Sequence, residues 1–157
     1  MNNIFIAFYH GKKPYKQGES KIKTHWFRIL DRLTRFFTNG KYSHCEIAIR
    51  DEEDKYSIYS ASVRDGGVRV HHGEELTTGQ WTLVPVDISE AAVIKYFEEH
   101  KGRGYDFFGA IGCAMTWIKN SSSRMFCSEF CAGALGYDEP WRFSPSELYS
   151  ILTKRSI

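Results

Sequence analysis

The chain has 157 residues, enough to form a hydrophobic core, and shows no repeat or linker, so we expect a single domain over residues 1–157. Hydrophobic residues make up 42% and charged residues 25%, as in soluble globular proteins. The net charge of +2 is too small to favour nucleic acid as a partner.

Alternating or β-rich runs separated by turn residues predict strands, and apolar residues at helical spacing predict helices. The pattern predicts strands at 3–8, 44–50, 56–63, 68–71 and 81–86, and helices at 24–37, 90–100, 107–118, 127–135 and from 145 onward. The fold class is therefore α+β. We expect an antiparallel sheet of about four to six strands packed against helices, with a cysteine-bearing helix after the sheet.

The acidic run at 51–54 predicts a hairpin between the second and third strands. A turn centred on Glu52 and Glu53 places His44 opposite Ser60 and Ala61, and Glu46 opposite Tyr59.

Two segments leave contact with lipid open. The helix at 24–37 carries Arg28, Arg32 and Arg35 off its apolar stripe, which is typical of a solvated face but also of a helix on a membrane surface. The apolar run from Phe107 to Ile118 is too short to span a bilayer and predicts a buried core helix. Peripheral membrane or lipid contact is thus the weaker alternative.

The N-terminus lacks a basic region followed by a long apolar run, so we expect no signal peptide and a cytoplasmic location. The four cysteines are then reduced thiols. They form no C-x-x-C pair, and no paired H-x3-H spacing accompanies them, so we expect no metal and no other cofactor. His71 and His72 are adjacent on a strand and read as surface residues.

Cys127 begins a predicted helix in the run M-F-C-S-E-F-C-A-G-A-L-G. Ser128 and Glu129 suit a first turn, and Gly136 suits the C-terminal stop. A thiol at a helix N-terminus has a lowered pKa, which makes it a nucleophile. The competing interpretation is a small buried hydrophobic residue.

His44 is the candidate base because it lies at the start of a strand, where its ring can reach a neighbouring element. A third polar group should orient the imidazole. Glu46 shares the strand face of His44, while Ser60 and Tyr59 are candidates from the returning strand.

Five motifs in order resemble the circularly permuted papain-like hydrolases of the NlpC type, which include lecithin:retinol acyltransferase-like proteins and bacterial and phage relatives. The motifs are Y-S-H-C-E-I-A-I, Y-S-A, Y-D-F-F-G, F-C-S-E-F-C-A-G-A-L and S-P-S-E-L-Y, and together they span roughly Phe5 to Tyr149. Having the His before the Cys is what the permutation implies. In a phage, the location implied is the host cytoplasm.

The resemblance implies Cys127 as nucleophile and His44 as general base of a cysteine hydrolase. The third polar residue of the family falls at or near Ser60, where relatives often carry a stronger acceptor, so either Glu46 orients the imidazole or the site is a dyad. Tyr42 and Tyr59 are assigned to substrate binding. We expect cleavage of a peptide or cell-wall-type amide through a thioester. The alternatives are a lipid-acting thioesterase or acyltransferase, and a non-catalytic binding or host-interaction module.

Overall fold

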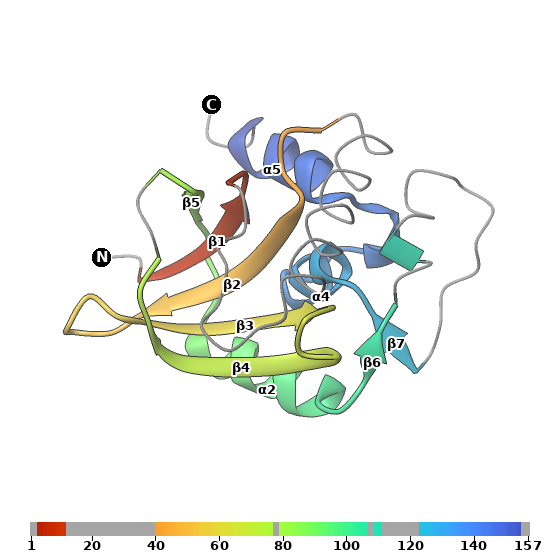
Figure 1. Ribbon diagram of the computed structural model, residues 1–157, viewed down its shortest axis with the longest axis horizontal. Helices are drawn as coiled ribbons and strands as arrows, with labels where there is room; N and C mark the ends of the chain where they lie inside the picture. The colour runs from red at the N-terminus through yellow and green to blue at the C-terminus, as the bar shows by residue number, and fades with distance from the viewer. Residues whose placement is uncertain (1–2, 12–39, 77–78, 107–108, 111–122, 155–157) are drawn as a thin grey trace, which may run out of the picture.

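A computed structural model describes residues 3–11, 40–76, 79–106, 109–110 and 123–154. These residues form a curled, mixed sheet of seven strands with three α-helices (Figure 1). The order across the sheet is β5-β1-β2-β3-β4-β6-β7. The strands are β1 (Ile4–Tyr9), β2 (His44–Arg50), β3 (Tyr56–Ser62), β4 (Gly67–Glu74), β5 (Trp81–Pro85), β6 (Gly104–Tyr105) and β7 (Arg124–Met125).

The five longer strands confirm the predicted α+β class and pair antiparallel with their neighbours. Pro85 ends the edge strand β5, as expected for a residue without an N–H donor. The expectation of an antiparallel sheet of about four to six strands is wrong at the other edge, where β6 and β7 bring the sheet to seven strands and pair in parallel. Both are two residues long and come from segments about 20 residues apart in the sequence, for which the sequence pattern predicts no strand.

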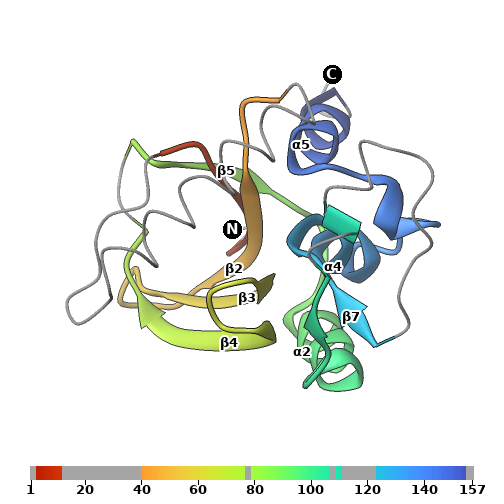
Figure 2. The ribbon, with the colours of Figure 1, turned by 45° about the vertical axis from the view of Figure 1, so that its right-hand side comes forward.

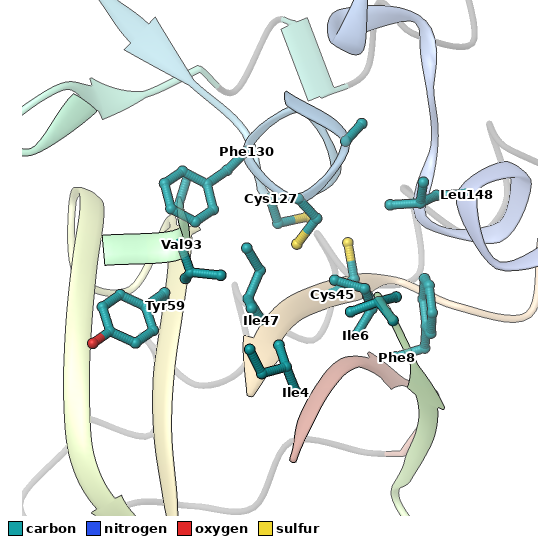
Figure 3. Close-up of a cluster of buried hydrophobic side chains, with 14 of the residues drawn as sticks. Ile4, Ile6, Phe8, Cys45, Ile47, Tyr59, Val93, Cys127, Phe130 and Leu148 are labelled. Carbon is teal, nitrogen blue, oxygen red and sulfur yellow. The ribbon is translucent and has the colours of Figure 1, made fainter. Parts of the chain in front are cut away.

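Side-chain alternation gives the sheet two different faces. One face packs on the helices through Ile4, Ile6 and Phe8 of β1 and Cys45 and Ile47 of β2 (Figure 3). The opposite face carries a second, smaller cluster of Ala7, Ala48 and Ile58 with partly buried neighbours. Because successive strand residues point to opposite faces, His44 and Glu46 share the face of Ala48.

The helices are α2 (Glu90–His100), α4 (Cys127–Ala134) and α5 (Pro145–Lys154). Figure 2 shows them on one side of the sheet, with α4 between α5 and α2. Helix α4 packs on β2 and β3, so the start of α4 is held close to the sheet.

Two predicted helix starts are confirmed by their caps. Ser89 accepts a hydrogen bond from the Ala92 N–H at the start of α2. Ser144 and Glu147 bind each other's backbone N–H groups at the start of α5, a reciprocal capping box. In α2 the buried residues are Val93 and Phe97, whereas Ala92 is exposed.

The predicted hairpin register was wrong by one residue. Tyr59 lies opposite Ile47, and Tyr56 lies opposite Arg50. The turn is centred on Glu53, because the Asp51 side chain accepts the N–H groups of Glu53 and Lys55 and closes a loop with an odd number of residues. Continuing this register by one residue places Glu46, not His44, beside Ser60.

The predicted amphipathic helix at 24–37 and nearly all of the apolar run from Phe107 to Ile118 lie outside the described residues. Within the part of the chain that the structure describes, no helix has the length and apolarity needed to cross a membrane.

Candidate active site

Cys127 is the first residue of α4, and its side chain lies between the helix and the sheet with an exposed fraction of 3%. The helix begins here because Glu129 turns back and accepts the Phe126 N–H, with 3.3 Å between nitrogen and Oε2. At its other end, Gly136 has a φ of 76°, a conformation that glycine adopts without steric cost. The local sequence thus places the thiol at a helix N-terminus, where the dipole favours a negative charge.

His44 contacts Cys127 from the first position of β2. Burial disfavours a charged imidazole, but the Cys127 thiolate and Glu46 outweigh burial and raise the pKa of His44 to about 9. This shift favours a thiolate–imidazolium pair, the arrangement that activates a cysteine nucleophile.

Two more thiols surround the sulfur atom of Cys127. Figure 3 shows Cys45 of β2 pointing from the sheet toward α4, in the direction of Cys127. A hydrogen bond from the Cys45 thiol lowers the pKa of Cys127 well below its usual range, and the charge of His44 lowers it further, against the opposing effect of burial. Burial raises the pKa of Cys45 and of Cys131, so these two thiols stay protonated while Cys127 ionises.

Glu46 orients the imidazole. Its Oε1 atom lies 3.0 Å from Nε2 of His44, which leaves Nδ1 for the thiol. The Glu46 side chain is only 6% exposed, yet hydrogen bonds and charge from His44 and Arg69 outweigh burial and lower the pKa of this carboxyl. Of the two alternatives left open by the sequence, the geometry therefore favours Glu46 as the orienting group.

Ser60 has a different position. It is fully buried, and its Oγ donates to the backbone carbonyl of Cys45 at 3.0 Å. No bond between Ser60 and His44 is present among the described residues. The hydroxyl thus fixes the strand beside His44 without reaching the ring.

Arg69 on β4 completes a chain of polar contacts that our sequence analysis missed. One of its terminal nitrogens binds Oε1 of Glu46, its Nε donates to Asp65 at 3.0 Å, and its other terminal nitrogen donates to the carbonyl of Ile58 at 3.2 Å. The only local signal was a cation between Val68 and Val70, on the face of β4 away from the core. Its partner lies two strands away, which local sequence patterns do not reveal.

A cavity of about 230 Å³ opens on the face of the sheet that carries His44 and Glu46. Its lining combines these two residues and Arg69 with apolar side chains, among them Tyr9, Ile58 and Trp81. The cavity can hold a group about as large as one amino-acid side chain next to His44 and Glu46, but Cys127 is not among the residues that line it.

Tyr42 and Tyr59 lie elsewhere. Tyr42 is buried against Phe8 and Tyr149, and its hydroxyl bonds to Thr82. Tyr59 faces the core and packs edge-on against Phe97. Neither side chain lines the cavity beside His44, so their assignment to substrate binding remains a prediction without support from this geometry.

The other predicted histidines are surface groups. His71 lies within 4 Å of Asp65 and Glu74, and His72 bonds to Ser57. Within the described ranges, no three His, Cys, Asp or Glu side chains are grouped so that they could hold a metal ion.

Comparison with known protein families, curated proteins and solved structures finds no match for this chain. The chemistry of the site therefore rests on its own residues and their geometry.

Proposed function

We propose that this protein is a cysteine hydrolase that cleaves an amide bond through a thioester, on a permuted papain-like fold. The observation that carries the proposal is the contact between Cys127, at the start of a helix, and His44, whose ring is held by Glu46. Helix α4 and strand β2 meet so that groups of β2 lower the pKa of the Cys127 thiol, while the two adjacent thiols, Cys45 and Cys131, keep raised pKa values. Ordinary packing of buried cysteines gives no reason for that difference.

In the proposed reaction, the Cys127 thiolate attacks the substrate carbonyl and forms a tetrahedral oxyanion. The Cys127 backbone N–H, at the first position of α4, has no acceptor within the helix and can donate to that oxyanion. His44 gives its proton to the departing amine, which leaves a thioester on Cys127. Neutral His44 then takes a proton from water, and hydroxide attack releases the acid and the free thiolate.

A second candidate is the cleavage of an acyl ester or thioester by the same residues. It is favoured by the apolar part of the cavity, where Tyr9, Ile58 and Trp81 could hold an acyl group. A non-catalytic module, the third expectation from sequence, requires an unreactive Cys127.

The test compares dipeptide p-nitroanilides with p-nitrophenyl acyl esters as substrates, with intact-mass detection of the acyl-enzyme. We expect Cys127→Ala to abolish both turnover and the adduct, since no other described thiol is ionised by such contacts. Cys131→Ala, one helical turn away, is the matched control and should keep both. Turnover of anilides should fall above about pH 9, where His44 loses the proton that the leaving amine needs.

Turnover of esters alone would favour the second candidate. Undiminished turnover by Cys127→Ala, or no adduct with either substrate class, would contradict the proposal.

A further inference from the structure

Glu46 and Arg69 come from strands that are not neighbours. Strand β3 lies between β2 and β4 (Figure 1), so the two backbones are roughly 10 Å apart. Ser60 lies opposite Arg69 on β4 and, by the observed register, beside Glu46 on β2. The three residues thus form one row across the sheet, on the face that bears the cavity.

The small side chain in the middle of this row lets the outer two meet. Ser60 is fully buried, and its hydroxyl is turned to the Cys45 carbonyl. The guanidinium of Arg69 therefore passes over Ser60 and binds the same Glu46 oxygen, Oε1, that contacts His44. A larger residue at position 60 would block this contact.

Arg69 is itself held at three points. Besides Glu46, it binds the Asp65 carboxylate and the Ile58 carbonyl, and its side chain is only 19% exposed. Such a guanidinium has lost the conformational freedom that makes exposed ion pairs weak. It is a fixed positive charge beside a buried carboxylate.

We propose that Arg69 is a positioning residue that fixes the Glu46 carboxylate against His44, so that the contacts Asp65–Arg69–Glu46–His44–Cys127 act as one chain. This role rests on the function proposed above for Cys127 and His44. Without Arg69, His44 alone opposes the burial that favours a neutral Glu46, so the pKa of this carboxyl rises and its neutral form becomes more populated. A neutral Glu46 no longer stabilises the imidazolium, and the thiolate of Cys127 then forms only at higher pH.

Among the described residues, several charged and titratable groups lie around this chain of contacts. His44 and Arg69 face Glu46 directly, and Cys127 and Cys131 of α4 lie close enough to interact with it or with His44. Asp65 faces Arg69, and His71 faces Asp65. His71→Gln in the wild-type background therefore separates the effect of the His71 side chain from that of the contacts between Asp65 and Cys127.

The experiment measures the rate of Cys127 alkylation by iodoacetamide against pH, with the labelled site mapped by mass spectrometry. The rate rises with pH as the thiol ionises, and this rise is the acid limb of the profile. We expect Arg69→Met to move the acid limb to higher pH by about one unit, the usual scale for loss of an adjacent opposite charge. Arg50→Met, which removes a cation from the far end of β2, is the matched control and should leave the limb in place. Because Arg69 acts through Glu46, Arg69→Met should add little in a Glu46→Gln background.

Two results are distinguishable. In the first, the acid limb of Cys127 alkylation lies at low pH in the wild type and at the same pH in Arg69→Met. This result would overturn the role of Arg69 and leave the proposed function intact. In the second, the wild type has no acid limb at low pH, which would contradict the proposed function itself. Folding of each variant is checked by its thermal transition, and where Arg69→Met does not fold, Arg69→Gln is measured against the same two criteria.

Discussion

Glu46 and Ser60 lie side by side on β2 and β3, but only the carboxylate contacts His44. The difference follows from what each side chain can reach. Glu46 shares the strand face of His44 two residues along, whereas the Ser60 hydroxyl is short and already bound to the Cys45 carbonyl. At the scale of single residues, the orienting role is thus decided by reach and by competing partners.

Substitution of Glu46 should change the reactivity of Cys127, whereas substitution of Ser60 should change only the stability of the fold. Glu46→Gln loses the negative charge that stabilises the imidazolium, so we expect the acid limb of Cys127 alkylation to rise by about one pH unit. Ser60→Ala should leave that limb unchanged and lower the free energy of unfolding by about 1 kcal/mol, because the Cys45 carbonyl loses a buried hydrogen bond. The alkylation profile and urea unfolding separate the two effects. A raised limb in Ser60→Ala with none in Glu46→Gln would reverse the assignment.

At the scale of elements, helix α4 joins the nucleophile to a buried acid. Glu129 caps the start of the helix from a position that is only 2% exposed. Burial raises the pKa of Glu129 from its usual 4.5 to about 7, although the Phe126 N–H favours the charged form. The helix that presents Cys127 therefore carries a carboxyl group that titrates near neutral pH.

This titration predicts a pH-dependent stability. Between pH 4.5 and about 7 the folded protein binds more protons at Glu129 than the unfolded chain does, so its contribution to stability falls as pH rises. Relative to Glu129→Gln, which keeps an acceptor for Phe126, the free energy of unfolding of the wild type should fall by about 3 kcal/mol across this window. Urea unfolding at pH 4.5 and pH 7.5 measures the difference.

Glu98→Gln provides the control because Glu98 lies on the exposed face of α2. Its stability relative to the wild type should not follow the same pH dependence. A wild-type protein that gains stability over Glu129→Gln as pH rises would contradict the buried, neutral state of Glu129.

Elements with strong local signals could be predicted from the sequence. The start of α4, the capping box of α5 and the strand that begins at His44 depend on residues within a few positions of one another. The register of β2 on β3 could not, because the Asp51 side chain adds one residue to the turn. A shift of one residue decides which side chain lies beside Ser60.

At the scale of the whole molecule, the site depends on contacts that no local pattern records. Arg69 reaches Glu46 across an intervening strand, and β6 pairs with β7 from a distant segment. His44 and Cys127 are 83 positions apart and meet because α4 packs on β2. Cys127 and His44 could thus be predicted from the sequence as the reactive pair. The contacts from Asp65 through Arg69 to Glu46, which hold His44 in place, could be identified only from the three-dimensional structure.

The central claim is that Cys127 is a thiolate paired with protonated His44. The most direct measurement is the pH dependence of iodoacetamide labelling at each cysteine, in the wild type and in His44→Ala. We predict that Cys127 reacts rapidly at a pH well below that needed by Cys45 and Cys131, and that His44→Ala moves its acid limb upward, because the imidazolium that lowers the pKa is gone. Labelling of Cys127 that needs the same high pH as Cys45 and Cys131, with or without His44, would contradict the account.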